Sequence, residues 1–301
     1  MKLTWDRTGE RYYETGTDRG VLFKKKSDGT YDKGVNWNGL SGVSDSPSGA
    51  EASPVWADNI KYVNMMSSEE YGATITAYQS PEEFDECDGT ASPVPGFRVR
   101  QQSRKEFGFS WRTKIGNDTE GTDHGYVIHV AYNCLASPSE KSYQTINDSP
   151  EAMELSWELT TTPVDIPGMK PSAKLEFDST KLTAAQMKIV EDTLWGTENT
   201  DPTLPSPNEW IGLLGGDPQP EVVLNRSTVS VAVGETASIE ATVVPAGTAV
   251  SWSSSATGKA TVANGVVTGV EAGTAVITAS ITVSGTSYTD TCTVIVTEAE
   301  G

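Results

Sequence analysis

The sequence has few of the residues that build catalytic and metal-binding sites. Its 301 residues include 3 cysteines and 2 histidines. Cys87, Cys134 and Cys292 stand far apart, so they show neither the pairing of a disulfide framework nor the spacing of a zinc site, and we expect the chain to fold in a reducing compartment. Asp123 and His124 are adjacent, but no nucleophile or third ligand accompanies them. We therefore expect no enzymatic activity, no cofactor and no metal site.

Basic residues and long apolar runs are also scarce. The chain has 22 lysines and arginines against 41 aspartates and glutamates, a formal net charge of −19. An acidic protein of this size repels nucleic acid and anionic membranes, although the same charge is also typical of an ordinary soluble surface. The first residues, MKLTWDRTGERYY, lack the apolar stretch of a signal peptide. We expect no signal peptide, no membrane insertion and assembly in a cytoplasm.

Alternating apolar and polar residues predict a β-rich chain over residues 1–220. A period of two is typical of strands with one buried and one solvent-facing side. Apolar rows of this kind are Phe107–Phe109–Trp111, Tyr126–Ile128–Val130–Tyr132–Cys134, Met153–Leu155–Trp157–Leu159 and a weaker Tyr71–Ala73–Ile75–Ala77. Gly108 and Ser110 occupy the side of the first row that we expect to face solvent. Ile60 and Tyr62 indicate a further strand.

One helix is predicted over residues 184–195. Thr183 is the expected N-cap, and Gln186 three residues later completes a capping box. Gly196 can end the helix. Three apolar residues share one face at helical spacing: Met187, Val190 and Leu194. We expect this helix to cover the sheet.

Three stretches lack a clear period: residues 36–54, 113–125 and 197–220. They are rich in glycine, serine, proline or charged residues. Long structureless loops in a compact domain are uncommon, and they are usually functional or disordered. We expect the first two to become ordered when copies of the chain stack, with plain surface loops as the alternative. Residues 201–220 are expected to be a Pro/Gly-rich linker.

Residues 221–297 predict a small all-β sandwich, followed by a tail at 298–301. Runs of β-branched residues alternate with glycine, proline, asparagine and serine. Asn264-Gly265 fits a two-residue hairpin turn with positive φ at both positions, and Trp252 is expected to fill the core. The core and turn residues are Gly234, Pro245, Trp252, Asn264, Gly265, Gly269 and Gly273. On these residues the segment resembles a bacterial Ig-like domain of group 2. The resemblance implies host surface polysaccharide as a candidate partner.

The N-terminal part carries several motifs in a fixed order. SPVWADNIKYVN (53–64) precedes EYGATITAYQSPEEFDECDG (70–89), a strand–loop–strand over 106–137 and a closing strand over 152–164. The order and spacing of these motifs resemble those of the major tail proteins of long-tailed phages, over residues 20–196. An Ig-like domain at the C-terminus also occurs in that family.

The resemblance implies a virion protein of the phage tail. It implies hexameric rings that stack into a tube around the tape measure protein, bounded by tail terminator and distal tail proteins and assembled in the host cytoplasm. The DNA genome would pass through the tube without specific binding. Carboxylates on the channel wall would repel phosphates at close range. Candidates are Glu154 and Glu158, with an ordinary solvated face as the alternative. The candidate ring-stacking loop contains Ser44, Asp45, Glu51, Trp56, Asp58 and Asn59.

We therefore predict a mainly β protein. Residues 1–200 form a β-sandwich or barrel-forming tail-tube domain with one packed helix, 201–220 the linker and 221–297 an Ig-like β-sandwich. We expect the first domain to complete its sheet only by joining copies of itself, around an anionic bore. The alternatives are a non-catalytic surface adhesin or carbohydrate-binding protein, and a capsid decoration protein with the same appended module. The absence of an export signal argues against the adhesin.

Overall fold

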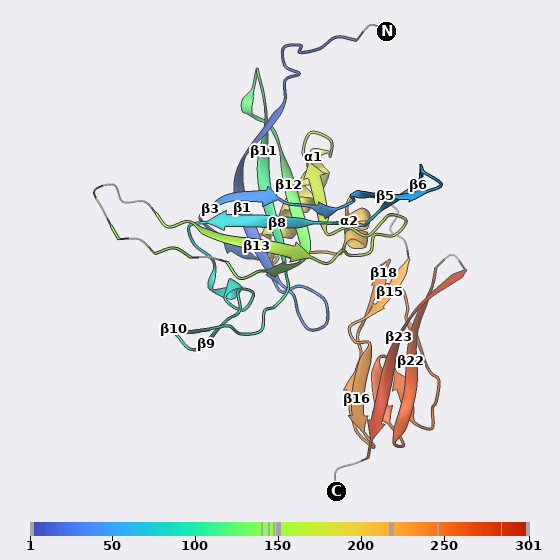
Figure 1. Ribbon diagram of the computed structural model, residues 1–301. Coiled ribbons are helices and arrows are strands. Elements are labelled where there is room, and N and C mark those ends of the chain that lie inside the picture. Colours follow the sequence, from blue (N-terminus) through green and yellow to red (C-terminus); the bar gives the residue numbers. More distant parts are fainter. Residues whose placement is uncertain are drawn as a thin grey trace. The chain divides into compact units, whose positions relative to one another are not determined.

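A computed structural model describes residues 3–139, 141–143, 145–146, 148, 152–216, 220–245, 247–283 and 285–298. The chain divides into two compact units, Met1–Lys26 with Thr30–Pro207 and Ser27–Gly29 with Asn208–Gly301. Strands dominate both units, which confirms the prediction of a mainly β protein (Figure 1). Within the described residues, no helix is long and apolar enough to cross a membrane.

The first unit is built on one large antiparallel sheet. Its strands run across the sheet in the order β2 (Val35–Trp37), β1 (Tyr13–Lys24), β11 (Phe107–Asn117), β12 (Gly121–Ala136), β13 (Leu155–Thr161), β8 (Gly72–Ala77) and β3 (Leu40–Asp45), and β14 (Lys174–Asp178) also pairs with β12. Strand β3 approaches β1, so the sheet curls back on itself. Outside it lie three two-stranded sheets: β4 (Ser48–Gly49) with β7 (Glu69–Glu70), and the hairpins β5 (Ala52–Ala57) with β6 (Ile60–Met66) and β9 (Thr90–Val94) with β10 (Phe97–Arg100).

An aromatic core fills the inside of the curled sheet. Trp37 contacts Phe84 of the 3-10 helix η1 (Glu82–Phe84), Phe109 and Trp157, with ring centroids 4.6, 5.5 and 5.4 Å apart. Each of these large side chains contributes about 1.5–3 kcal/mol when buried. The chain therefore completes this core alone. The expectation that the domain completes its sheet only by joining other copies is wrong for the core, because residues of its own strands and η1 plug the centre.

Strand β12 changes the direction of its side chains at a bulge. Phe109 pairs with Ala131 and Phe107 with Cys134, so β12 has one residue more than β11 between these pairs. Asn133 adopts the left-handed conformation there, with φ of 48°. Cys134 consequently faces the aromatic core with Ala131. The predicted Tyr126–Cys134 row is thus one face only as far as Tyr132.

The predicted helix is confirmed as α1 (Ala184–Trp195). Thr183 accepts a hydrogen bond from the backbone N–H of Gln186, the capping box is complete, and Gly196 follows with φ of 73°. The three apolar residues of its predicted face are buried. Tyr126 donates a hydrogen bond to Glu191 (2.8 Å), and the Arg19 guanidinium stacks on Trp195. Helix α1 therefore lies on the outer face of the sheet.

The helix and the aromatic core cover the sheet from both sides, which corrects one expectation. Gly108 and Ser110 are buried, although their alternation with phenylalanines predicts a solvent-facing side. A Cβ on Gly108 would overlap Cδ2 of Leu204. The row predicted from Met153 also starts later than expected, because Met153 is 44 % exposed and precedes β13. The buried faces of β13 and β8 are otherwise confirmed.

The stretches expected to be loops are largely regular structure. Residues 36–54 contain β3, β4 and parts of β2 and β5, and residues 113–125 form the ends of β11 and β12. These strands are exposed on one or both faces, so their glycine and serine residues show no alternation of apolar and polar residues. Within 197–220 the chain forms α2 (Pro207–Leu213).

Residues 201–205 form a strap bound to the first unit. Gly34 donates its backbone N–H to Pro202 O (2.9 Å), Thr203 donates to Thr193 O (2.7 Å), and Tyr132 donates its hydroxyl to Pro205 O (2.7 Å). Leu204 is buried between these bonds. This part of the expected linker is therefore held in place.

The second unit is a set of small sheets around an aliphatic core. The strands pair as β15 (Glu221–Leu224) with β18 (Ala241–Val244), as β16 (Thr228–Ala232), β23 (Thr286–Thr297), β22 (Gly273–Val283) and β19 (Ser251–Ser254), and as β17 (Thr236–Ser238), β21 (Val266–Gly269) and β20 (Ala260–Ala263). Valine, isoleucine and alanine side chains fill the space between them. Cys292 is buried on β23 as a plain strand residue.

Candidate assembly surface

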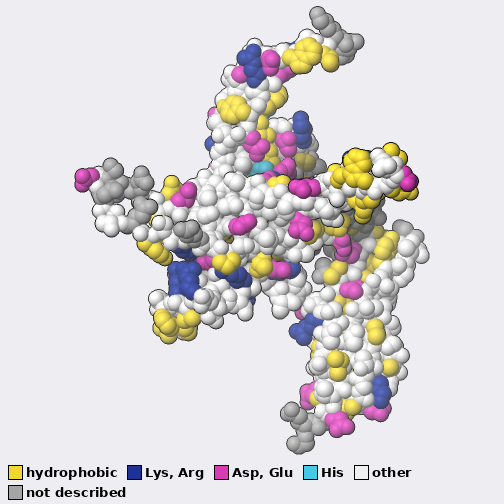
Figure 2. All heavy atoms as spheres, viewed as in Figure 1, with side chains coloured by type: hydrophobic (Ala, Val, Ile, Leu, Met, Phe, Trp, Pro, Cys, Tyr) yellow, Lys and Arg dark blue, Asp and Glu magenta, His cyan; other side chains and the backbone are white. Residues whose placement is uncertain are grey.

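The hairpin β5–β6 projects from the first unit with its apolar side chains in solvent. Asp58 and Asn59 form its two-residue turn with φ of 51° and 62°, a left-handed conformation that short polar side chains tolerate. The exposed apolar residues on the two strands are Val55, Trp56, Ile60, Tyr62, Val63, Met65 and Met66. Trp56 is 66 % exposed and Tyr62 71 %. Figure 2 shows these side chains gathered on the projecting arm.

Such an arm is unstable as an isolated element. A two-stranded hairpin is at best marginally stable in water, and a contiguous exposed apolar patch usually marks an interaction site. Hairpin β5–β6 is the outer part of an arm that continues the β3–β8 pairing of the main sheet in the same register, with interruptions on either side of β4–β7. The exposed apolar residues of the hairpin are therefore typical of a protein–protein interaction surface.

The residues predicted for ring stacking do not lie on one loop. Glu51, Trp56, Asp58 and Asn59 belong to the β5–β6 hairpin and its approach. Ser44 and Asp45 instead belong to β3 of the main sheet, paired with Thr74 and Ala73. The structure thus brings four of the six together.

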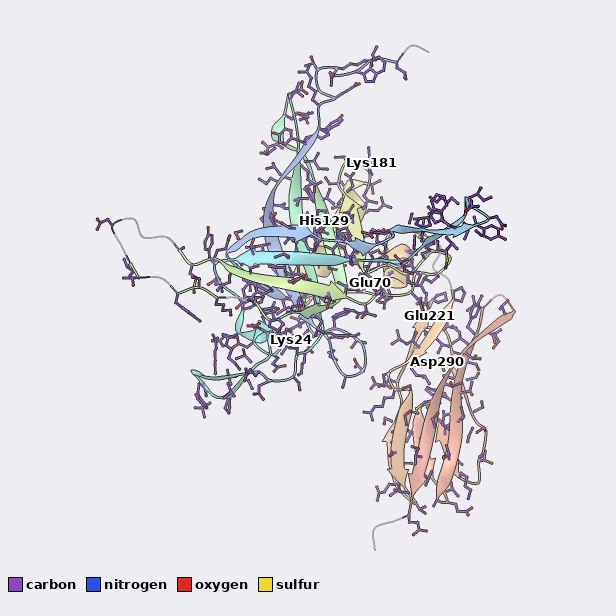
Figure 3. All side chains as sticks on the ribbon, viewed as in Figure 1. Lys24, Glu70, His129, Lys181, Glu221 and Asp290 are labelled. Atoms are coloured by element: carbon purple, nitrogen blue, oxygen red, sulfur yellow. The ribbon has the colours of Figure 1, made fainter. Side chains whose placement is uncertain are left out.

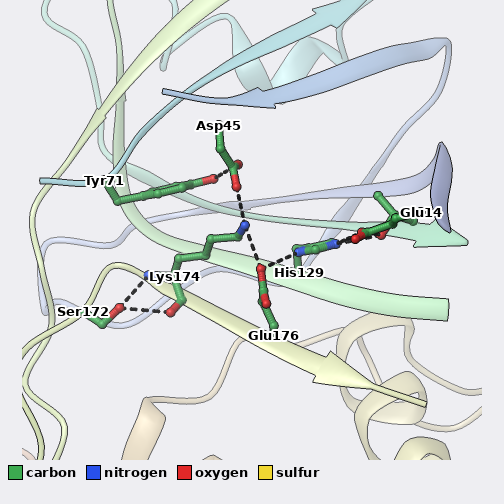
Figure 4. A network of polar contacts seen from close by, with 8 residues as sticks. Glu14, Asp45, Tyr71, His129, Ser172, Lys174 and Glu176 are labelled. Carbon is green, nitrogen blue, oxygen red and sulfur yellow. Dashed lines mark hydrogen bonds and ion pairs between the residues drawn. The ribbon is translucent and has the colours of Figure 1, made fainter. Parts of the chain in front are cut away.

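Asp45 enters a polar network at one end of the curled sheet (Figure 4). Its carboxylate accepts hydrogen bonds from Tyr71 (2.7 Å) and from the Lys174 ammonium. The ammonium also contacts Glu176 at 2.8 Å. Burial alone would lower the pKa of Lys174, but hydrogen bonds to the two carboxylates outweigh it and raise that pKa. The network therefore ties β3 to β14, two strands that do not pair.

His129 continues this network inside the sheet. Its ring stacks on Trp111 with centroids 5.0 Å apart, Nδ1 lies 3.3 Å from Glu176 and Nε2 lies 3.3 Å from Glu14. Thr113 Oγ1 is 2.8 Å from Nε2. Burial and, after it, the Lys174 charge lower the pKa of His129. Sequence reasoning missed this network, because its members come from six separate strands or turns.

The candidate channel residues are both exposed. Glu158 lies on the solvent side of β13, opposite Thr74 of β8. Glu154 precedes the strand and accepts a hydrogen bond from the Ser41 hydroxyl (2.6 Å). Their spacing places both on the face of β13 opposite Trp157.

The predicted turn residues of the second unit have the expected backbone. Asn264 and Gly265 have φ of 49° and 80° between paired Ala263 and Val266, which fits the two-residue turn. Gly234 and Gly273 also have positive φ, Pro245 follows a cis peptide bond, and Gly269 packs against Ala232 O. Trp252 is only half-buried and packs at the margin of an aliphatic core, so it does not fill that core as expected.

The two histidines and the cysteines remain as the side chains with acid–base or ligand chemistry. Among the described residues, no group of three or more His, Cys, Asp or Glu side chains is placed to hold an ion. His124 contacts Glu120 at 2.6 Å, and its neighbour Asp123 takes no part in that pair. Burial raises the pKa of the Cys87 thiol to about 12 and raises that of Cys134 further.

No protein-family model matches the sequence, and no curated protein matches it either. Among solved structures, the chain is similar to a chain of the anti-feeding prophage (AFP) baseplate, with a TM-score of 0.30 and 10 % identity over 59 % of this chain and 97 % of the other. It is also similar to a chain of the sheath–tube complex of an extracellular contractile injection system, PVC, in its extended state. That TM-score is 0.24, with 14 % identity over 53 % of this chain and 88 % of the other. Scores this low carry no argument about function.

Proposed function

We propose that this chain is a structural protein of a phage tail, the subunit of the tail tube. Copies join into hexameric rings, and the rings stack around the tape measure protein between the tail terminator and distal tail proteins. The role is assembly and passive conduction of DNA, without catalysis. The observation that carries the proposal is the β5–β6 hairpin, whose large apolar side chains lie in solvent on a domain that already has a complete core.

The hairpin supports self-association because its position in the sequence coincides with the family motif. SPVWADNIKYVN, the stretch that resembles tail proteins, is the β5 strand, its turn and most of β6. Covering one large apolar side chain contributes about 1.5–3 kcal/mol. A ring of copies that covers several such residues per subunit gains enough to offset the entropy of association.

The charge of the chain suits a conducting tube. With a net charge of −19, a channel lined by carboxylates such as Glu154 and Glu158 gives phosphates no counterion-release gain. The repulsion acts over about 8–10 Å at physiological salt, so DNA slides instead of binding.

The second unit serves as an outer module in this proposal. It is a compact unit with its own core and thus folds without contributing strands to the main sheet. Host surface polysaccharide is its proposed partner. Deleting residues 217–301 should leave tube assembly intact, and loss of tubes in that truncation would make the module structural.

Negative-stain microscopy of the concentrated full chain tests the proposal. We expect hexameric rings or tubes from the unmodified chain and a loss of stacking in Trp56→Ser/Tyr62→Ser. The matched control is Tyr143→Ser/Ile146→Ser, which removes apolar side chains that are 80 % and 85 % exposed but lie outside the hairpin. Stable monomers at all concentrations would refute the tube, and binding of those monomers to host cell walls would favour the adhesin.

A further inference from the structure

A second hairpin, β9–β10, also carries apolar side chains into solvent. Val94 and Phe97 flank its Pro95-Gly96 turn and are each 59 % exposed. Figure 1 shows β9–β10 and β5–β6 projecting from different ends of the first unit. In Figure 2 the tip of β9–β10 is hydrophobic and a group of lysine and arginine side chains lies beside it.

The charged layer at the base of β9–β10 is cationic on its outer side. Arg98 contacts Asp85 at 2.8 Å, with side chains 49 % and 16 % exposed. Arg100 contacts Asp88 at 2.9 Å, with side chains 48 % and 9 % exposed. In both pairs the carboxylate lies beneath and the guanidinium faces solvent. The less exposed acids therefore anchor the arginines, whose guanidinium groups stay accessible to solvent.

The single negative charge of Asp88 has three basic side chains around it. Besides Arg100, its carboxylate has Lys141 at 3.4 Å and Arg104 at 3.9 Å. Three cations around one partly desolvated carboxylate leave an excess of positive charge that a further anionic group would stabilise. Lys24, on the same side of the unit (Figure 3), contacts Glu86 at 3.6 Å. The basic side chains at this end thus outnumber the carboxylates that they contact, although Glu82 and Glu83 of η1 add two negative charges nearby.

Acidic residues flank the β5–β6 hairpin at its base. The hairpin itself carries one acidic and one basic residue, Asp58 and Lys61, whereas Glu51 precedes it and Glu69 and Glu70 follow on β7. Residues 90–105 contain four basic residues and no acidic one, although residues 82–88 contain five acidic residues. Both segments also present exposed apolar side chains. Opposite charge around two apolar centres is the arrangement of a specific protein–protein contact.

We propose that hairpin β9–β10 of one copy binds hairpin β5–β6 of the next copy. The inference rests on the self-association proposed above and names the surface that receives the β5–β6 arm. Because the two hairpins are different patches on different ends of the unit, the contact is heterologous and propagates from copy to copy. DNA is the less suitable partner, because Val94 and Phe97 would gain nothing from a phosphate backbone.

Two variants that each lose one hairpin test this contact in the full chain. Variant A is Trp56→Ser/Tyr62→Ser, and variant B is Val94→Ser/Phe97→Ser, which keeps both arginine ion pairs. Each variant alone should form particles of a single mass that do not grow further, because it has only one of the two hairpins that the contact needs. A one-to-one mixture should form particles of twice that mass and no longer assemblies, because B supplies an intact β5–β6 and A an intact β9–β10. Analytical ultracentrifugation measures both masses.

The outcomes separate this contact from the tube itself. The proposed contact would be overturned if variant B formed tubes as long as those of the unmodified chain, or if the mixture were no heavier than its components. Neither result would contradict the tube itself. A mixture of doubled mass alongside an unmodified chain that forms no tubes would support the contact and refute the tube. Tyr143→Ser/Ile146→Ser should behave as the unmodified chain. Phe97→Thr, which keeps a strand-favouring residue, replaces variant B if thermal melting shows that B is unfolded.

Discussion

Truncating Leu204 should destabilise the first unit by about 2 kcal/mol. Leu→Ala substitutions in cores cost about 2–5 kcal/mol, and the low end applies because Leu204 lies on a strap at the surface of its unit and is 7 % exposed. The residue sits among three hydrogen bonds that hold residues 201–205 to the unit. If residues 201–205 were an unbound linker, the same Leu204→Ala substitution would change the free energy of unfolding by less than about 0.5 kcal/mol.

Calorimetry of the full chain measures this effect against an internal reference. The two compact units should unfold in separate transitions. For a unit of this size, 1 kcal/mol corresponds to about 2–4 °C, so Leu204→Ala should lower the Tm of the first unit by about 4–8 °C. The transition of the second unit should not move.

Gly108→Ala supplies a second, coupled measurement. A methyl group at this position would overlap Cδ2 of Leu204 and approach Tyr31. Gly108→Ala should therefore cost more in the unmodified chain than beside Leu204→Ala, with a coupling free energy of about 1 kcal/mol in a double-mutant cycle. A Tm shift below about 1 °C for Leu204→Ala, together with additive Gly108 and Leu204 effects, would refute the strap.

Burial lowers the pKa of His129 in the folded state below its unfolded value of about 6.5. The stability of the fold is therefore complete above about pH 6.5 and is lost as the pH falls from there through the folded pKa. His129→Gln should flatten that loss in urea titrations between about pH 7 and 5, and an unchanged profile would show that other groups cause it. A hydrogen bond from Arg112 lowers the pKa of Asp18, whose stabilisation is present above its unfolded pKa of about 3.8 and lost as the pH falls through the folded value. Asp18→Asn should cost about 1 kcal/mol at pH 7, discounted for the exposure of Asp18, and nothing where Asp18 is protonated. Glu154→Lys/Glu158→Lys should make tubes retain nuclease-protected duplex DNA at low salt, whereas DNA that stays nuclease-sensitive would place both residues outside the channel.

Local signals in the sequence are enough to predict α1 and the buried strands. Thr183 and Gln186 form a capping box from contacts within one turn, so their spacing alone defines the start of the helix. Trp157 and Ile75 follow the period of two because one side of each strand faces the core. These features depend on neighbours in sequence, and for that reason they could be predicted.

Features that depend on distant residues could not be predicted in the same way. Ser110 looks like a solvent-facing residue until α1 and the strap cover that side of β11. The left-handed Asn133 shifts Cys134 to the other face, and nothing in the alternation marks that one residue. Ile60 and Tyr62 indicated strand β6, but its partner β5 was missed, because an exposed strand needs no alternation. The cluster around Asp88 was missed because Asp88, the arginines of residues 98–104 and Lys141 come from three separate segments.

A complete core changes how the proposed assembly has to work. If the sheet needed other copies to bury its aromatic residues, an unassembled subunit would be unfolded, and every assembly variant would also be a folding variant. Trp37, Phe84 and Trp157 are instead buried within one chain, while Trp56 and Phe97 lie on hairpins outside the core. Stability and self-association therefore depend on different residues. A hairpin variant that melts like the unmodified chain yet fails to assemble has lost only the contact, and this separation is what makes a failed assembly interpretable.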